Sequence, residues 1–267
     1  MYSNKLPLAS LPNTRDLGGF PTRDGRHVRP GRLIRSGMLA PATPEDLAQL
    51  TGTFGLRTIV DFRTPTGQQN HPDPALDGVT HISNPILETL TSGITHEETG
   101  QTPIEALTKS IHASGLSARQ FMAGLYRNMV CDGFSQRQYA KFFDILCEGR
   151  EGATLWHCTL GKDRVGLGTA MLLLALGASD ADAEEDYLAT QIFFHDEIER
   201  DVAQVAQALN NSDAAETVRA LNSACPEYIE TAFAEMRAEC GSIEGYLEAR
   251  IGLTAERRAS LQALYLD

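Results

Sequence analysis

The sequence has no hydrophobic run long enough to cross a membrane. Hydrophobic residues make up 42% of its 267 residues, but the longest apolar stretch lies around Met171 to Leu176. A membrane span needs about 20 such residues, so this stretch is expected to be a core helix. No charged segment followed by an apolar one opens the chain, and nothing marks it for the usual secretory route. We therefore expect a cytoplasmic protein without stable membrane insertion.

Cysteine is also scarce. The five cysteines are an odd number and are scattered, which favours reduced thiols over a disulfide framework, and their spacing to histidine does not resemble a zinc site. The nucleotide-binding motif Gly-x4-Gly-Lys-Ser/Thr is missing, because Trp156 stands where its first glycine would be. Gly166-x-Gly168 is too short for a dinucleotide fingerprint. The sequence predicts neither a metal nor a cofactor.

The sequence contains fewer basic than acidic residues. It has 23 Lys and Arg residues and 35 Asp and Glu residues, and the resulting net charge of −12 argues against general nucleic-acid binding. The charge is uneven: residues 1–63 carry nine basic and five acidic residues, whereas residues 64–267 carry fourteen and thirty. The basic N-terminal portion either helps to collect an anionic substrate or consists of arginines in ordinary surface pairs. The sequence leaves both alternatives open.

The residues best suited to chemistry lie in a loop between a predicted strand and a predicted helix. The apolar segment 153–156 predicts the strand. The helix is expected to begin near Arg164 and to run through Leu176, with Gly177 as its C-terminal stop. Residues 157–164, His-Cys-Thr-Leu-Gly-Lys-Asp-Arg, connect the two.

Such a loop can direct successive N–H groups and the positive end of the helix dipole at one phosphate. Arg164 can add a bidentate guanidinium, and the same field favours the thiolate of Cys158, a nucleophile for phosphoryl transfer. We predict that Cys158 and Arg164 are catalytic and that His157 fixes the loop by hydrogen bonds. The residues predicted to bind the substrate are Thr159, Leu160, Gly161 and Lys162 of this loop, together with Asp61 at the end of a predicted strand. The alternative is that Cys158 is only a small buried hydrophobe.

The loop resembles the His-Cys-x5-Arg signature of cysteine-dependent phosphatases, and its Gly-Lys-Asp-Arg ending is similar to that of the atypical bacterial tyrosine and lipid phosphatases. Similar motifs recur along nearly the whole chain, at Asn13–Phe20, Arg35–Gly37, Asp61–Arg63, 228–247 and 252–254. The resemblance implies an α/β fold with a central, mostly parallel sheet flanked by helices and with extra C-terminal helices. It further implies one phosphatase domain over residues 1–267, and it leaves export by a non-classical route open.

The resemblance also implies a reaction in two steps. Cys158 attacks phosphorus to form a phosphocysteine, and water then hydrolyses it. In the family an aspartate inside the loop is the general acid, which corresponds to Asp163; Asp61, at the end of a predicted strand, is the second candidate. Phosphoinositide phosphatases carry a basic residue at the position of Lys162, so phosphoinositides join phosphotyrosine, phosphoserine and phosphothreonine as candidate substrates. The alternative is that Lys162 is a solvated lysine.

Two departures from the family pattern affect the expected mechanism. Val165 stands where the family usually has Thr or Ser, whose hydroxyl hydrogen-bonds the cysteine sulfur and helps it to leave. We therefore expect slow hydrolysis of the phosphocysteine unless Thr159 substitutes, and a phosphate-binding pseudophosphatase is the alternative. Gly67 replaces an acidic residue, which leaves the role of residues 61–67 open. Sulfur transfer on a rhodanese-like loop is a rival enzyme class, against which the Gly-Lys-Asp-Arg ending argues.

Several further elements are predicted from capping signals. Thr43-Pro44 marks a helix start, and Ser117-x-x-Gln120 and Ser135-x-x-Gln138 read as capping boxes.

Residues 64–101 are expected to be loop-rich, with one short strand, and to form a rim or flap. The C-terminal portion is expected to be all helical and too polar to be mostly core. The resemblance suggests that helices at about 190–225 form a lid; the alternative is that they pack permanently on the sheet.

Overall fold

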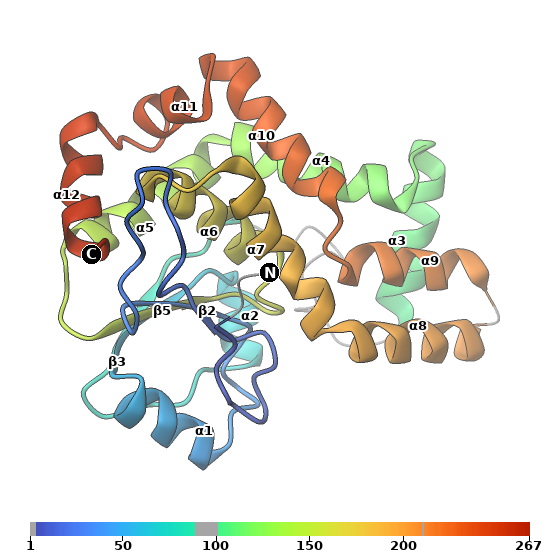
Figure 1. The fold of residues 1–267 in the computed structure, drawn as a ribbon. Coiled ribbons are helices and arrows are strands. Elements are labelled where there is room, and N and C mark those ends of the chain that lie inside the picture. Colours follow the sequence, from blue (N-terminus) through green and yellow to red (C-terminus); the bar gives the residue numbers. More distant parts are fainter. Residues whose placement is uncertain (1–3, 89–100, 210) are drawn as a thin grey trace.

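The computed structural model shows a five-stranded sheet that lies among helices (Figure 1). The structure describes residues 4–88, 101–209 and 211–267; among residues 101–106 the only side chain that it describes is that of Ile104. The strands are β1 (Arg15–Asp16), β2 (Leu33–Ser36), β3 (Leu56–Asp61), β4 (Thr80–Ser83) and β5 (Ala153–His157). Their order in the sheet is β1-β2-β5-β3-β4. Only the β1–β2 pair is antiparallel, so the prediction of a mostly parallel sheet flanked by helices is confirmed.

The central strand β5 brings the predicted loop to one edge of the sheet. All five of its residues are buried, as expected for a parallel strand with neighbours on both sides. Ser36 of β2 and Asp61 of β3 both lie opposite His157, the last residue of β5. The carboxyl ends of three parallel strands therefore meet where the loop begins, which is the edge at which open α/β sheets bind ligands.

The helices surround this sheet, and α6 is the most deeply buried of them. The helical elements in the described residues are α1 (Pro44–Ala48), the π-helical η1 (Gln49–Thr53), α2 (Pro65–Asn70), α3 (Gln101–Ser114), α4 (Ala118–Cys131), α5 (Gly133–Cys147), α6 (Asp163–Leu176), α7 (Asp180–Phe193), α8 (His195–Leu209), α9 (Ser212–Asn222), α10 (Pro226–Cys240), α11 (Ile243–Ala249) and α12 (Ala255–Tyr265). Every residue of α6 after Asp163 is buried, because α7, α11 and α12 pack around it. Gly177 ends α6 with a φ of 106°, a left-handed conformation that favours glycine.

Two of the three predicted helix starts are confirmed, and one is wrong. Thr43 caps α1 and Ser117 caps α4, both with complete capping boxes. Ser135, however, lies inside α5, whose N-cap is Asp132. The Asp132 carboxylate accepts from the Ser135 N–H at 2.8 Å, and the Ser135 hydroxyl donates to the carbonyl of Ile86 at 2.9 Å. Asp132 thus takes the capping position, while the serine hydroxyl ties α5 to the chain beyond β4.

The segment after β3 contains a helix that was not predicted. Residues 64–101 were expected to be loop-rich with one strand, and β4 confirms the strand. Helix α2 begins at Pro65, with the Thr64 hydroxyl accepting from the Gly67 N–H at 3.2 Å. The signal, Thr followed by Pro, is the same as at Thr43-Pro44. Residues 89–100, part of the predicted flap, lie outside the described residues.

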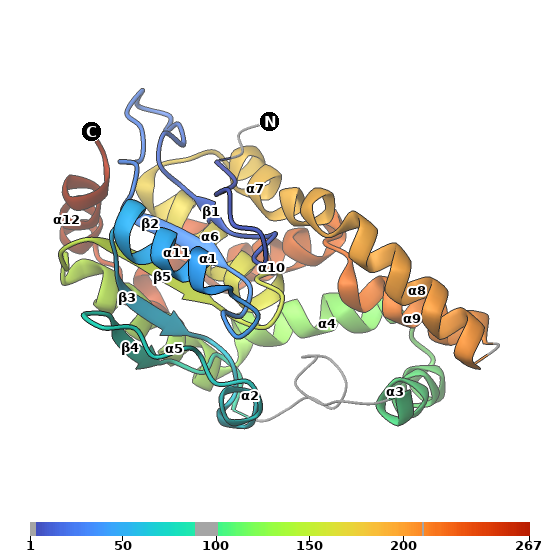
Figure 2. The same ribbon diagram turned by 90° about the horizontal axis from the view of Figure 1, so that it is seen from below.

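The C-terminal helices contribute more to the core than their composition suggested. Each of α10, α11 and α12 carries a narrow apolar face, and these faces include the fully buried rings of Tyr228, Tyr246 and Tyr265. Most residues of α10, α11 and α12 nevertheless lie outside the core, which agrees with the expectation that this portion is too polar to be mostly core. Helices α8 and α9 differ: they lie side by side and extend away from the sheet, near α3 (Figures 1 and 2). None of the helices in the described residues has the length and apolar character that a membrane crossing requires.

Candidate active site

The loop between β5 and α6 is held from outside by its carbonyl groups. Five consecutive carbonyl oxygens, those of residues 158–162, accept hydrogen bonds. Cys158 O accepts from His157 Nδ1 at 3.2 Å, and Thr159 O accepts from the Met38 N–H at 2.9 Å. Asn13 Nδ2 donates to Leu160 O at 2.9 Å and to Gly161 O at 3.2 Å; Gly161 O also accepts from Arg35 Nη2 at 2.6 Å, and Lys162 O accepts from the Gly166 N–H at 2.8 Å. Apart from Gly166, which belongs to α6, these donors come from β5 and from the N-terminal segment 13–38.

The orientation of these carbonyls determines where the N–H groups point. In a trans peptide unit the C=O of one residue and the N–H of the next point in opposite directions. Because β5 and segment 13–38 bind the carbonyls of residues 158–161 and the carbonyl of Lys162 bonds into α6, the N–H groups of residues 159–163 point away from these partners. The first turn of α6 adds its positive dipole end there. This is the geometry of an anion-binding loop.

Gly161 makes the close approach between the loop and β2 possible. Its φ is 68°, and a Cβ atom there would lie 2.4 Å from the carbonyl oxygen of Ser36. A side chain at this position would therefore be strained and would also push the loop off the end of β2. Gly37 is similarly tight, since a Cβ there would lie 3.2 Å from the carbonyl oxygen of Thr159.

Cys158 and Arg164 lie at the two ends of this loop, as predicted. Cys158 is 2% exposed and Arg164 is 4% exposed. Arg164, in the first turn of α6, donates from Nη2 to the Thr159 hydroxyl at 3.2 Å, so its guanidinium bends back over the loop. Val165 is fully buried in the main core, and its side chain carries no hydroxyl for the sulfur of Cys158.

Asp163 begins α6 and is held by a phenol that sequence reasoning missed. The Tyr126 hydroxyl of α4 donates to Asp163 Oδ1 at 2.7 Å and lies 2.8 Å from the Tyr187 hydroxyl of α7. Burial raises the pKa of Tyr126 well above its usual value, and the charge of Asp163 adds to the shift, so the phenol stays protonated. No local pattern marks Tyr126 or Tyr187, because both read as ordinary core residues of amphipathic helices.

Lys162 does not extend into solvent. Its side chain is completely buried, so the alternative of a solvated lysine is wrong. The ammonium group donates to the carbonyls of Leu221 and Ser223 at the end of α9, lies 3.2 Å from Asp163 Oδ1 and faces the ring of Tyr228. A cation at a helix C-terminus is favourable, so this contact ties the loop to α9.

A buried ion cluster explains how Arg35 is aimed at the loop. The Asp186 carboxylate of α7 binds both Arg35 Nη1 and Arg15 Nε, and all three side chains are at most 5% exposed. Burial and the charge of the neighbouring Arg35 lower the pKa of Arg15 to about 10. Burial alone would raise the pKa of Asp186, but the charges of Arg35 and Arg15 outweigh it and hold this pKa below its usual value. Arg15 and Arg35 are therefore in buried ion pairs, rather than on an exposed surface that would attract substrate.

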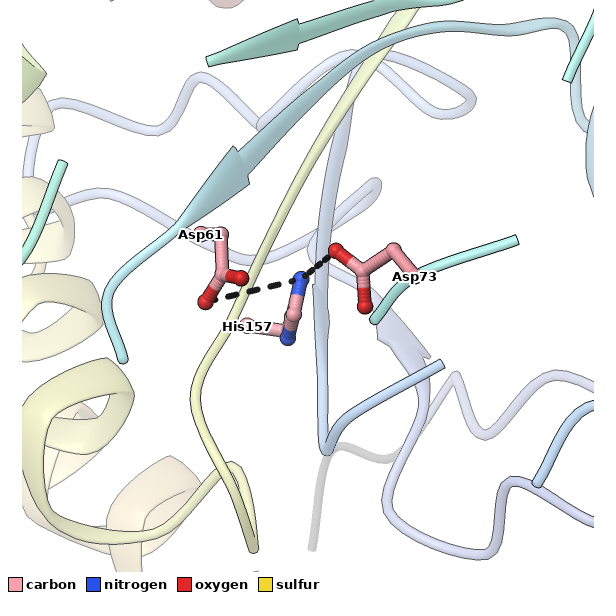
Figure 3. A group of neighbouring side chains, drawn as sticks. All are labelled: Asp61, Asp73 and His157. Carbon is pink, nitrogen blue, oxygen red and sulfur yellow. Dashed lines mark hydrogen bonds and ion pairs between the residues drawn. The ribbon is translucent and has the colours of Figure 1, made fainter. Parts of the chain in front are cut away.

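Asp61 lies beside the loop, in a second cluster. Both of its carboxylate oxygens accept from Arg63, whose Nη2 also binds Asp73 at 2.9 Å. The ring of His157 lies between the two carboxylates, with Nε2 at 2.8 Å from Asp73 and 3.9 Å from Asp61 (Figure 3). Asp73 follows α2, and no sequence signal pointed to it.

The second cluster does not fit a metal ion. Asp61, Asp73 and His157 offer ligand atoms within 4.8 Å of one another. The guanidinium of Arg63, however, already binds both carboxylates and supplies the positive charge that a metal would bring. An added divalent cation would have to displace it. The absence of a metal requirement stays a prediction.

Comparisons with known proteins agree with the motifs. A model described as a tyrosine phosphatase family matches residues 6–267. A Cupriavidus necator protein named putative tyrosine-protein phosphatase is 35% identical over 186 residues, which cover 68% of this chain and 62% of that protein. The triple specificity protein phosphatase PtpB of Mycobacterium tuberculosis is 27% identical over 187 residues, or 66% of this chain and 65% of its own length. A tyrosine-protein phosphatase of Nostoc commune is 38% identical over 55 residues, 21% of this chain and 19% of that protein. In each case the matched segment spans less than two thirds of the relative.

Proposed function

Since this chain belongs to the tyrosine phosphatase family whose model it matches over residues 6–267, we propose that it is a cysteine-dependent phosphatase that hydrolyses phosphate monoesters. The observation that carries the proposal is the outward binding of the carbonyls of residues 158–162. This arrangement supplies converging N–H groups for a phosphate, with a sulfur at one end of the loop and a guanidinium at the other.

The reaction proceeds through a phosphocysteine. The thiolate of Cys158 attacks phosphorus, the bond from phosphorus to the ester oxygen breaks, and the leaving oxygen takes a proton from an acid. Water then attacks the phosphocysteine and returns a proton to the acid, the S–P bond breaks, and the thiolate and inorganic phosphate are released. The loop N–H groups and Arg164 hold the equatorial oxygens through both steps.

Asp163 is the general acid of this proposal. Tyr126 and Lys162 both engage its Oδ1, which leaves Oδ2 for the transfer of a proton, and its side chain is 16% exposed. Asp61, the second candidate, has both oxygens engaged by Arg63, which leaves neither of them to face a leaving group.

The proposed substrates are phosphotyrosine, phosphoserine, phosphothreonine and phosphoinositides. A relative carries the name triple specificity protein phosphatase, which supports a range of phosphorylated residues. The proposal that phosphoinositides are substrates rests on Lys162 alone. Its ammonium faces α9 in this structure, so it would have to leave Leu221 and Ser223 to reach a second phosphate.

Helices α8 and α9 are the proposed lid, within the 190–225 region. They form a small apolar cluster of their own, separate from the main core, built from Ile198, Val202, Ala215 and Val218. The contact of Lys162 with the end of α9 would break on opening. Limited proteolysis with and without a phosphate analogue tests this: identical cutting of α8 and α9 in both states would exclude a lid.

Hydrolysis of para-nitrophenyl phosphate tests the main proposal. We expect turnover by the wild-type protein and none by Cys158→Ser, with tungstate binding retained in both. Tungstate binding without turnover in the wild type would instead identify a pseudophosphatase, the candidate that Val165 favours. Transfer of sulfur from thiosulfate to cyanide, in the absence of phosphate hydrolysis, would identify the sulfurtransferase class.

A further inference from the structure

The ring of His157 is placed so that both of its nitrogens must donate. Its Nδ1 lies 3.2 Å from the carbonyl oxygen of Cys158, and a carbonyl can only accept. Its Nε2 lies 2.8 Å from Asp73 Oδ2. If Asp73 is ionised, this second bond also requires a proton on the ring, and His157 is then an imidazolium ion.

The surroundings of Asp73 keep it ionised. Its Oδ1 accepts from Arg63 Nη2 at 2.9 Å, and both carboxylate oxygens are thus occupied by donors. Burial alone would raise the pKa of Asp73, but the hydrogen bond from His157 and the charge of Arg63 are among the interactions that lower it below its usual value.

The other charged groups around the ring balance this assignment. Asp61 lies 3.9 Å from Nε2, and Arg63 bridges Asp61 and Asp73. Within these four groups, two carboxylates, one guanidinium and one imidazolium sum to zero, whereas a neutral ring would leave them with a net negative charge. His81 also lies near Asp73, at an exposed position. On the other side, Tyr139 lies close enough to Cys158 for their charges to interact, and its hydroxyl donates to the backbone carbonyl of Arg164 at 3.0 Å.

We propose that Asp73 is a positioning residue for Cys158: it holds His157 as a fixed imidazolium, whose Nδ1–H binds the Cys158 carbonyl and whose charge stabilises the neighbouring thiolate. The bond from Nδ1 is the first of the five that turn the loop carbonyls outward. A cationic neighbour is also one of the ways in which proteins favour a thiolate over a thiol. Asp73 thus acts on the sulfur through the ring, without touching it. The catalytic meaning of this role rests on the proposed phosphatase activity.

The experiment is a titration of the Cys158 thiol by its rate of alkylation with iodoacetamide as a function of pH. Alkylation reads the thiolate directly and needs no phosphatase turnover. In Asp73→Asn, the amide can still accept from Nε2 but no longer offsets a positive ring. We expect the pH at half-ionisation to rise, and the alkylation rate below it to fall about ten-fold. Asp77→Asn, at an exposed position four residues away, is the matched control and should titrate like the wild type.

A double variant separates action through His157 from a general structural effect. In His157→Asn the side-chain amide replaces the Nδ1 donor but carries no charge, and thiolate formation should again shift to higher pH. If Asp73 acts through the ring, adding Asp73→Asn to His157→Asn should change nothing further. Equal additional shifts in both backgrounds would overturn the proposal.

One measurement needs no substitution and decides the matter even if the variants do not fold. In the ¹⁵N NMR spectrum of the wild-type histidines, both ring nitrogens of His157 should show the shifts of protonated nitrogen at neutral pH. A shift typical of an unprotonated nitrogen for either position would refute the inference. Should the wild type fail to hydrolyse phosphate esters, the proposed function falls, while the alkylation and NMR results still judge the role of Asp73.

Discussion

Asn13 offers the sharpest test of how the loop is oriented. Its Nδ2 group donates to the carbonyls of Leu160 at 2.9 Å and Gly161 at 3.2 Å, and its Oδ1 accepts from Arg15 Nη1. Asn13→Ala removes these bonds in a site that is 1% exposed. A buried bond contributes about 1 kcal/mol, and an unpaired buried carbonyl costs about 1–3 kcal/mol. We expect the free energy of unfolding to fall by about 2–4 kcal/mol.

The effect on activity should exceed what this loss of stability explains. Without Asn13 the carbonyl of Leu160 loses this bond and that of Gly161 keeps only Arg35, so these peptide units and their N–H groups are held less firmly. A misplacement of about 1 Å in a catalytic group costs about a hundred-fold in rate. We therefore expect kcat/KM for para-nitrophenyl phosphate to fall about 10- to 100-fold, with a parallel loss of tungstate affinity. Asn13→Asp, which keeps the acceptor for Arg15 but loses the donor, should lose activity similarly.

Asn84 provides the matched control. It is equally buried, and its Nδ2 donates to a backbone carbonyl, that of Gln138, at 3.0 Å. Asn84→Ala should therefore lower stability, by about 1–2 kcal/mol, but leave kcat/KM within about two-fold of the wild type. If Asn13→Ala unfolds more easily yet keeps wild-type kcat/KM and tungstate affinity, the carbonyl argument is wrong.

Three further substitutions test other parts of the site. Asp163→Asn should lower kcat on alkyl phosphates by about a hundred-fold or more, with a smaller loss on para-nitrophenyl phosphate, whose leaving group needs less protonation; near-normal turnover of alkyl phosphates would exclude Asp163 as the acid. Val165→Thr should supply a hydroxyl near the sulfur, so rapid-quench experiments should show less phosphocysteine than in the wild type; the absence of a burst in the wild type would contradict the expected slow second step. Lys162→Met removes the bonds to Leu221 and Ser223, and limited proteolysis should cut α8 and α9 faster, whereas unchanged cutting would argue against this contact as a closing element.

The parts of the fold that follow from local patterns could be predicted. The strand before the loop and the helix after it rest on short-range signals, an apolar run and a glycine at a left-handed stop. The starts of α1 and α4 likewise follow from the caps at Thr43 and Ser117. The Asp132 cap was missed because the sequence also offers a capping box at Ser135. The structure shows that Asp132 accepts from the Ser135 N–H, while the Ser135 hydroxyl binds Ile86.

The supports of the loop could not be predicted, because they depend on contacts between distant segments. Asn13 lies 147 residues from Leu160, and Asp73 lies 84 residues from His157. Neither has a spacing that points to its partner. Lys162 also shows this limit. Its place in the motif suggested that its side chain contacts either substrate or solvent, but in the folded protein its ammonium group binds the end of α9.

The buried cluster of Arg15, Arg35 and Asp186 makes physical sense only in connection with the loop. Burying three charges is costly, and a well-packed apolar replacement is often as stable or more so, so the cluster is weak evidence for stability as such. It does fix the direction of a rigid guanidinium: Asp186 holds Arg35 Nη1, and Nη2 is thereby aimed at the carbonyl of Gly161. Two guanidinium groups against one carboxylate also leave a net charge of +1 directly behind a loop proposed to bind a dianion. An apolar substitute would lose both the donor and this charge, so the cluster serves the orientation and electrostatics of the loop even where it adds nothing to the free energy of folding.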